Sequence, residues 1–139
     1  VAGKMRKLNK HVFQNAKSVC TFDQATRIEL DDHTAVILMS HDFETDLGLI
    51  HHFLKKEISY LGLLGPKKRM KKIEDTLRKN DPDIDLNAAV NLFAPTGLDI
   101  GAESPEEIAL SIVAEIIATM RKREGKPLKE RKGPIHERD

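Results

Sequence analysis

The sequence predicts an α/β fold with a parallel sheet flanked by helices, and three consecutive segments carry this prediction. Thr34–Ser40 is an apolar run bounded by acidic and polar residues, which is typical of a strand buried on both faces. Apolar residues recur at helical spacing from Asp46 to Lys56, and Ser59–Leu64 is a second short apolar run. A strand, a helix and a strand within about thirty residues form a βαβ unit, whose strands lie parallel with a right-handed crossover.

The segments on either side of this unit are assigned by the same patterns. Residues 1–14 are basic and lack periodicity, so we expect a loop or an arm, and Ala16–Phe22 is a candidate short strand. After Gly65, a helix is predicted from Pro66 to about Lys79, where an Asn-Asp-Pro sequence stops it.

The longest helix is predicted from Pro105 to about Arg123 and has the most complete start signal. Ser104 can accept a hydrogen bond from the Glu107 amide while the Glu107 carboxylate reaches back to the Ser104 amide. The apolar residues of this helix form a face broad enough to cover a sheet. The preceding segment, Asp85–Phe93, is ambiguous, and we expect a short helix that runs into an extended stretch.

The composition is that of one domain of a soluble protein. The 139 residues are 40% hydrophobic and 32% charged, no apolar run reaches the ~18 residues of a membrane helix, and the first residues lack a signal segment. We therefore expect a cytoplasmic protein with an α/β domain over residues 1–125 and a charged tail over residues 126–139.

Charge and cysteine content argue against several functions. A net charge of +1, the lack of Trp and a single Tyr argue against nucleic-acid binding, which uses basic surfaces and aromatic platforms. Cys20 is the only cysteine and can form neither an internal disulfide nor a thiolate cage, so we expect a buried, inert thiol. His51 and His52 are neighbours in a predicted helix and point about 100° apart, so no metal site is expected.

Three polar loops follow apolar segments, and ligands of open parallel sheets bind outside the carboxyl ends of the strands. In the first loop, Ser40, His41 and Asp42 are close enough in sequence to hydrogen-bond one ligand, and His41 with Asp42 could act as a proton-transfer pair. The alternative is that Asp42 or Thr45 caps the following helix while His41 is exposed. Spacing alone favours the capping interpretation.

The second loop, at Gly65, leads into a helix whose first turns carry five positive charges, beginning with Lys67, Lys68 and Arg69. Positive charge is unfavourable at a helix N-terminus unless an anion binds there or the side chains extend into water. A helix start after a glycine turn is also a ready anion site. The pattern therefore leaves a phosphate site and a solvated basic face equally open.

The third loop contains Gly97 and Gly101, which allow the backbone to approach a ligand closely, and Asp99 between them can hydrogen-bond such a ligand. The alternatives are that the glycines only turn the chain and that Asp99 only stabilises its own turn, which is the commoner role for such a residue.

Together, the three loops resemble the successive signatures of the C-terminal Rossmann domain of the XdhC/CoxI family, the xanthine dehydrogenase accessory factors. The matching stretches are SHDFETD at Ser40–Asp46, YLGLLGPKKR at Tyr60–Arg69 and APTGLDIGAESPEEIALSIVAEII at Ala94–Ile117, in the family's order and spacing. The resemblance covers about residues 8–136 and implies a Rossmann-like parallel sheet.

The resemblance implies a binding and delivery factor rather than an enzyme. Family members are thought to bind newly made molybdenum cofactor, or molybdopterin, and to hold it while a cysteine desulfurase installs its sulfido ligand. They then deliver it to a molybdenum hydroxylase such as xanthine dehydrogenase. The phosphate or dinucleotide of that cofactor would be anchored by Lys67–Arg69, with Gly97–Gly101 lining the same edge beside Ser40–Asp42. A homo-oligomer is also expected.

The sequence departs from the family pattern at three places. The family domain usually begins with a strand and a glycine-rich dinucleotide-binding turn, which nothing before Ala16 supplies, so we expect a partial sheet without its first β-α-β. Pro66 stands where Ser is common, and Thr96 stands where an aliphatic residue is usual.

Two other classes of function are open. The Rossmann-like order and the His41-Asp42 pair also suit a fragment of an NAD(P)-binding oxidoreductase. The broad apolar helix and the missing strands suit a non-catalytic interaction module that completes its fold by oligomerisation.

Overall fold

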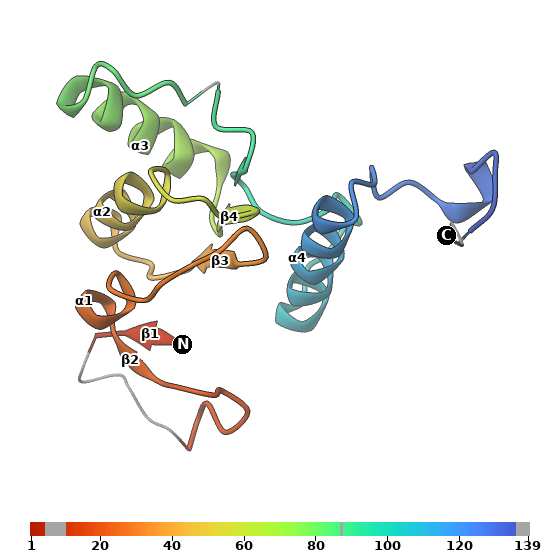
Figure 1. Ribbon diagram of the computed structural model, residues 1–139, viewed down its shortest axis with the longest axis horizontal. Coiled ribbons are helices and arrows are strands. Elements are labelled where there is room, and N and C mark those ends of the chain that lie inside the picture. Colours follow the sequence, from red (N-terminus) through yellow and green to blue (C-terminus); the bar gives the residue numbers. More distant parts are fainter. Residues whose placement is uncertain (5–10, 87, 136–139) are drawn as a thin grey trace.

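The chain forms two parallel β-sheets with helices on both sides, as Figure 1 shows for the computed structural model, so the predicted α/β class is confirmed. The structure describes residues 1–4, 11–86 and 88–135. The smaller sheet pairs two short strands, and the larger sheet has the order β3-β4-β5. The strands are β1 (Ala2–Gly3), β2 (Cys20–Thr21), β3 (Ala35–Leu38), β4 (Tyr60–Leu63) and β5 (Leu92–Phe93). The helices are α1 (Phe22–Ala25), α2 (Phe43–Phe53), α3 (Lys67–Asn80), α4 (Pro105–Met120) and the 3-10 helix η2 (Leu128–Glu130).

The larger sheet is organised around β4, which lies between β3 and β5 and is buried along its whole length. Successive side chains of a strand point to opposite faces of the sheet. Leu61 and Leu63 join the hydrophobic core that α2 and α3 complete. Tyr60 and Gly62 point to the other face, where Tyr60 hydrogen-bonds Glu115 of α4. Helices α2 and α3 therefore cover one face of the sheet, and α4 contacts the other face at Tyr60 (Figure 1).

The predicted helices around this sheet are present, with boundaries set by their caps. Helix α2 begins at Phe43, three residues earlier than predicted, because Asp42 caps it. Helix α4 begins with the predicted reciprocal hydrogen bonds between Ser104 and Glu107. It ends at Met120, slightly before the predicted end.

Three predictions for shorter segments are corrected. Residues 1–14, predicted as a loop or an arm, contain β1, and residues 5–10 lie outside the described residues. The strand predicted over Ala16–Phe22 shortens to β2, because Thr21 caps α1 and Phe22 is its first residue. The described residues of Asp85–Phe93 form turns before β5 rather than a short helix.

The apolar face of α4 is largely exposed, which corrects the expectation that it covers a sheet. The buried residues of α4 are Ser111 and Ile112. A stripe of apolar side chains, 40% to 63% exposed, runs along the helix at Leu110, Val113, Ile117 and Met120. Cys20 is likewise half-buried rather than buried.

The described helices include none with the length and apolar character that crossing a membrane requires. In residues 126–135 of the charged tail, the structure forms a single short turn, η2, whose Leu128 is exposed.

Replacing Ile112 by Ala should destabilise the protein far more than the same change at the adjacent Val113. Ile112 is 4% exposed on the side of α4 that meets the third loop at Gly97, whereas Val113 is 51% exposed. We expect the free energy of unfolding to fall by about 2–4 kcal/mol for Ile112→Ala and by less than about 0.5 kcal/mol for Val113→Ala. Urea denaturation measures both, and equal losses would show that the other face of α4 is packed.

Candidate functional site

The loops that follow β3, β4 and β5 lie at one edge of the larger sheet, because the three strands are parallel. Helices α2 and α3 begin at this edge (Figure 1), so the N–H groups of two helix N-termini also point towards it. The polar residues that the sequence indicates as candidate ligand contacts therefore lie along this edge of the sheet.

A buried carboxylate joins the first two loops. Asp46 in α2 is fully buried, and its Oδ1 accepts a hydrogen bond from the Ser40 hydroxyl at 2.5 Å. Its Oδ2 accepts one from Nη2 of Arg69, also at 2.5 Å, and the Arg69 side chain is 21% exposed. Ser40 and Arg69, both predicted to bind a ligand, therefore have partners within the protein, and the charge of Arg69 is compensated by Asp46.

Asp42 caps α2, as the capping interpretation of the first loop requires. Its Oδ1 accepts a hydrogen bond from the Thr45 amide at 2.9 Å, and its Oδ2 lies 3.4 Å from Nζ of Lys4. The hydrogen bonds from Thr45, together with the Lys4 ammonium group, lower the pKa of Asp42 to about 2. His41 is exposed and has a left-handed backbone with φ of 57°. Within the described part of the chain, the predicted proton-transfer pair of His41 and Asp42 does not form a hydrogen bond.

A cavity of about 440 Å³ lies beside the first loop, within the range typical of small-molecule sites. The three polar residues of that loop line one side of it. The other lining residues come from β1, from the segments near it and from the end of β3, and include Lys4, Phe13, Phe22 and Met39. The sequence carries no signal for Lys4, because the two-residue strand before it has no periodic pattern.

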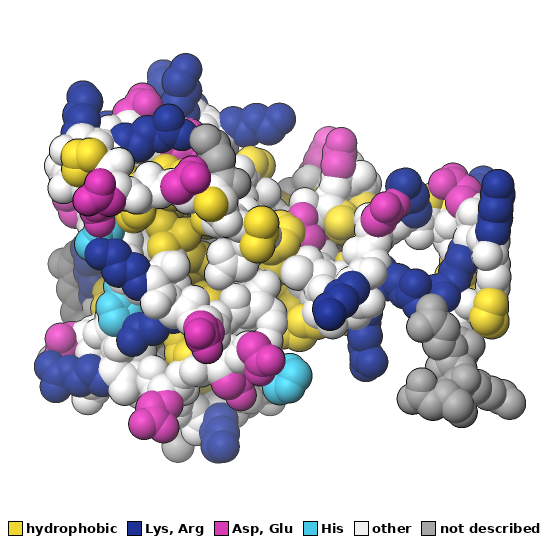
Figure 2. All heavy atoms as spheres, turned by 45° about the horizontal axis from the view of Figure 1, so that its top comes forward, with side chains coloured by type: hydrophobic (Ala, Val, Ile, Leu, Met, Phe, Trp, Pro, Cys, Tyr) yellow, Lys and Arg dark blue, Asp and Glu magenta, His cyan; other side chains and the backbone are white. Residues whose placement is uncertain are grey.

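The second loop places exposed lysines at an uncapped helix start. Pro66 is the N-cap of α3 and makes no side-chain cap, and the first turn has no acidic residue. Lys67 and Lys68 are exposed, and Figure 2 shows basic side chains gathered over the α3 part of the molecule. Nζ of Lys72 lies 4.4 Å from the centre of the Phe43 ring, a cation-π contact to α2. Because Arg69 pairs with Asp46, the exposed positive charges in the first turn of α3 are those of Lys67 and Lys68.

The glycine before that helix start allows the turn itself. Gly65 has φ of 144°, and a Cβ at this position would lie 3.2 Å from Cδ of Arg69. Gly65 thus lets the chain turn closely over the Arg69 side chain as that side chain reaches Asp46.

The third loop is held against α4. Gly97 has φ of 111°, its N–H donates to Glu115 at 2.7 Å, and a Cβ there would lie 2.5 Å from Oγ of Ser111. The absence of a side chain at Gly97 therefore allows the third loop to pack closely against α4. Asp99 and Gly101 are exposed, and neither lines the cavity beside the first loop.

A buried polar cluster anchors the third loop and was not foreseen from the sequence. The Tyr60 hydroxyl donates to the Glu115 carboxylate and also hydrogen-bonds the Thr96 hydroxyl. Burial and the Glu115 carboxylate raise the pKa of Tyr60 above its ordinary value, so the phenol stays protonated and continues to donate. Thr96, which departs from the family pattern, thus supplies a hydroxyl that Tyr60 uses.

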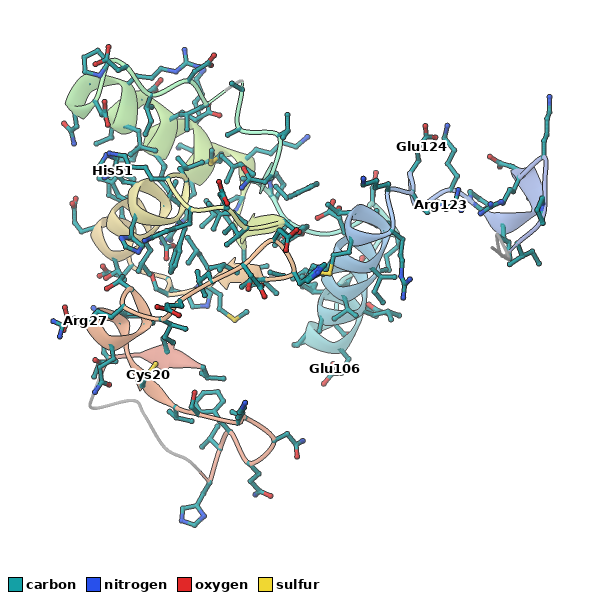
Figure 3. All side chains as sticks on the ribbon, viewed as in Figure 1. Cys20, Arg27, His51, Glu106, Arg123 and Glu124 are labelled. Carbon is teal, nitrogen blue, oxygen red and sulfur yellow. The ribbon has the colours of Figure 1, made fainter. Side chains whose placement is uncertain are left out.

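Histidines of α2 make contacts within the fold. His51 points from α2 towards the end of α3, where its Nε2 lies 3.0 Å from Oδ2 of Asp81 (Figure 3). Across residues 1–4, 11–86 and 88–135, no cluster of three or more His, Cys, Asp or Glu side chains is arranged to hold a metal ion.

Comparison with known proteins gives a family and several relatives. Residues 3–116 match the family model described as the XdhC Rossmann domain. A probable xanthine dehydrogenase subunit of Bacillus subtilis (strain 168) is 40% identical over 90 residues, which are 65% of this chain and 24% of that protein. An uncharacterized protein of Escherichia coli (strain K12), YqeB, is 29% identical over 103 residues, which are 74% of this chain and 18% of that protein.

A solved structure shares the fold. The crystal structure of a xanthine dehydrogenase from Bacillus halodurans matches with a TM-score of 0.70 at 32% identity, over 88% of this chain and 35% of that chain. The Rossmann-like fold is therefore confirmed, and the chain spans about a third or less of the length of these relatives.

Replacing Asp46 by Ala leaves the Arg69 guanidinium group without its buried partner. Removal of one member of a buried pair costs about 3–5 kcal/mol, and the partial exposure of Arg69 lowers the expected loss in the free energy of unfolding to about 2–4 kcal/mol. The double variant Asp46→Ala with Arg69→Met should recover part of this loss, because no unpaired charge remains. Chemical denaturation compares the three proteins, and a double variant less stable than Asp46→Ala would contradict the pairing.

The cap at Asp42 should make stability depend on pH in acid. The pKa of Asp42 is about 2 in the folded protein against an ordinary value of 3.8, so the unfolded chain binds the proton first as the pH falls. The stabilisation is complete above the unfolded pKa and is lost as the pH falls towards 2. In urea titrations from pH 5 to pH 2, the free energy of unfolding should fall less steeply for Asp42→Asn, which still caps α2 but does not titrate. Identical slopes would refute this role.

Proposed function

Because this chain belongs to the XdhC Rossmann-domain family, we propose that it is part of an accessory protein that binds the molybdenum cofactor and delivers it to a molybdenum hydroxylase such as xanthine dehydrogenase. The family membership supports an accessory role connected with xanthine dehydrogenase. The cofactor itself is inferred from the chemistry of the sheet edge.

The observation that carries the proposal is an uncapped, basic helix start at the same sheet edge as a cavity of ligand size. Helix α3 lacks a side-chain cap and an acidic first turn, and Lys67 and Lys68 are exposed there. A phosphate at this position would neutralise the two ammonium groups and accept hydrogen bonds from the first N–H groups of the helix. The phosphate of a pterin cofactor has this chemistry.

The cavity beside the first loop fits the remainder of such a cofactor. Exposed His41 and Lys4 offer hydrogen-bonding groups to a heterocycle, while Phe22 and Met39 provide an apolar wall. The exposed Asp99 and Gly101 of the third loop are further candidate contacts at the same edge, and Gly97 shapes that loop by packing it on α4. When bound, the cofactor supplies the redox chemistry of the client enzyme, and the residues of this chain hold and orient it.

The partners of the whole protein form part of the same proposal, because the chain spans 24% of its Bacillus subtilis relative. They are a molybdenum hydroxylase that receives the cofactor, a cysteine desulfurase that acts while the cofactor is held, and further copies of the chain.

Replacing Lys67 and Lys68 together by Ala should weaken molybdopterin binding about tenfold or more, because two charge-assisted contacts to phosphate are lost. Molybdopterin released from a molybdenum hydroxylase is titrated under anaerobic conditions, and its pterin fluorescence reports binding to the full chain. The matched control, Arg78→Ala with Lys79→Ala, removes the same charge from the opposite end of α3 and should bind like the parent.

Two outcomes would overturn the proposal. Equal molybdopterin affinity of the parent and of the Lys67→Ala, Lys68→Ala variant would rule out a phosphate site at the start of α3. Tighter binding of NAD⁺ than of molybdopterin, measured by calorimetry on the same protein, would favour the oxidoreductase alternative instead.

A further inference from the structure

Glu115 of α4 joins that helix to both the larger sheet and the third loop. Its side chain is half-buried, and one carboxylate oxygen, Oε2, accepts two hydrogen bonds. One comes from the hydroxyl of Tyr60 at the start of β4, and the other comes from the Gly97 N–H at 2.7 Å. A single carboxylate oxygen therefore ties the backbone of the third loop to a side chain of the sheet.

The Tyr60 hydroxyl is itself held in place, so the sheet determines where the Glu115 carboxylate lies. The Tyr60 ring stacks on Phe93 of β5, with ring centres 4.3 Å apart and planes 11° apart. Its hydroxyl also hydrogen-bonds the Thr96 hydroxyl. Gly62 leaves room for both groups, because a Cβ there would lie 2.6 Å from Oγ1 of Thr96 and 2.7 Å from Cε1 of Tyr60.

The exposed part of the third loop takes its position from α4. The Gly97 amide donates to Glu115, and the Leu98 amide donates to the Ser111 carbonyl of α4 at 3.2 Å. The residues that follow, including Asp99, are exposed. The two backbone bonds to α4 therefore set where the exposed groups of the loop lie.

The third loop also lies next to the start of α3. The Thr96 amide donates to the carbonyl of Leu63, the last residue of β4, at 3.0 Å, and Lys67 follows four residues later. The third loop and the basic start of α3 thus share one stretch of the sheet edge. They are held there by different carboxylates, the loop by Glu115 and the helix start by Asp46.

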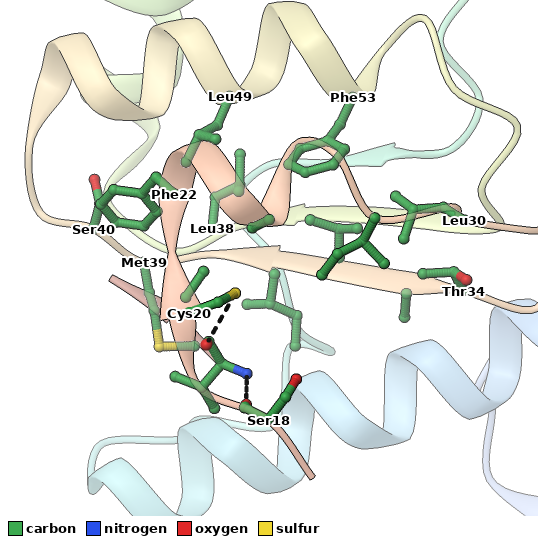
Figure 4. A pocket seen from close by; sticks show the side chains of 17 residues that line it. Ser18, Cys20, Phe22, Leu30, Thr34, Leu38, Met39, Ser40, Leu49 and Phe53 are labelled. Carbon is green, nitrogen blue, oxygen red and sulfur yellow. Dashed lines mark hydrogen bonds between the residues drawn. The ribbon is translucent and has the colours of Figure 1, made fainter. Parts of the chain in front are cut away.

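The apolar cavity beside β3 is separate from these contacts. Figure 4 shows this cavity, of about 340 Å³, whose lining residues all lie between Val1 and Phe53. They include none of the residues that bond to Glu115. A change at Glu115 is therefore expected to leave that part of the molecule unaltered.

Building on the proposed function, we propose that Glu115 is a positioning residue for binding of the molybdenum cofactor and acts through the backbone of the third loop. It bonds to two donors of the fold and holds the exposed groups of the loop, Asp99 and Gly101, ready beside the phosphate site at α3. Without the carboxylate the Gly97 amide loses its acceptor. Ligand binding would then also have to order the loop, which lowers the affinity.

The test is a molybdopterin titration of the full chain, followed by pterin fluorescence under anaerobic conditions. Glu115→Ala removes the acceptor of both hydrogen bonds and should weaken binding about tenfold. Glu115→Gln keeps an uncharged acceptor oxygen and should bind within about threefold of the parent. The matched control, Glu106→Ala, makes the same change at an exposed position of α4 and should bind like the parent.

Two further measurements separate positioning from a general loss of stability. In hydrogen exchange followed by NMR on the ligand-free proteins, the Gly97 amide should exchange at least about tenfold faster in Glu115→Ala than in the parent. Ile112→Ala weakens the packing of the same helix but keeps the carboxylate, so it should bind molybdopterin within about threefold of the parent. Should Glu115→Ala fail to fold, Tyr60→Phe removes one of the two donors and should weaken binding about threefold.

Two results would overturn the role of Glu115 while leaving the proposed function in place. One is equal molybdopterin affinity of the parent and Glu115→Ala, or of the parent and Tyr60→Phe where Glu115→Ala does not fold, with binding still weakened in Lys67→Ala, Lys68→Ala. The other is an equal loss of affinity in Glu115→Ala and Ile112→Ala, which would follow from destabilisation of α4 alone. A parent protein that does not bind molybdopterin would instead overturn the proposed function, and the role of Glu115 with it.

Discussion

The buried carboxylate of Asp46 is the interaction on which the geometry of the ligand edge depends. A carboxylate without water is costly unless it is paired and hydrogen-bonded, and Ser40 after β3 and Arg69 in α3 provide both contacts. These contacts hold the first loop and the starts of α2 and α3 in one arrangement. The pairing of Arg69 with Asp46 thereby positions the exposed side chains of Lys67 and Lys68 at the start of α3.

Much of the larger sheet could be predicted from the sequence, because its elements are long enough to show a period. The βαβ unit around β3, α2 and β4 is one example, and the capping box at Ser104 is another. Strands β1 and β2 have two residues each and exist through pairing with distant neighbours, so no local pattern marks them. The helical spacing of the apolar residues in α4 also does not reveal whether another part of the protein covers them.

The place of the candidate site was predictable for a topological reason, since the carboxyl ends of parallel strands meet at one edge. The roles of individual side chains were less so. The cap at Asp42 follows from local spacing and was one of the two interpretations. The partner of Arg69 lies 23 residues away and the contact from Tyr60 to Glu115 spans 55 residues, so sequence patterns contain no trace of either.

Helix α4 is attached to the rest of the molecule by fewer contacts than α2 and α3 are, so the two parts differ in their free energy of local opening. Helices α2 and α3 share a continuous apolar core with β4, whereas α4 joins β4 through the hydrogen bond between Tyr60 and Glu115 and meets the third loop through Ile112. Elements with few buried apolar contacts open at lower free energy than the global transition. Because the Gly97 and Leu98 amides bond to α4, the third loop belongs to the same opening unit. Detachment of this helix would uncover one face of the sheet while leaving the basic start of α3 in place.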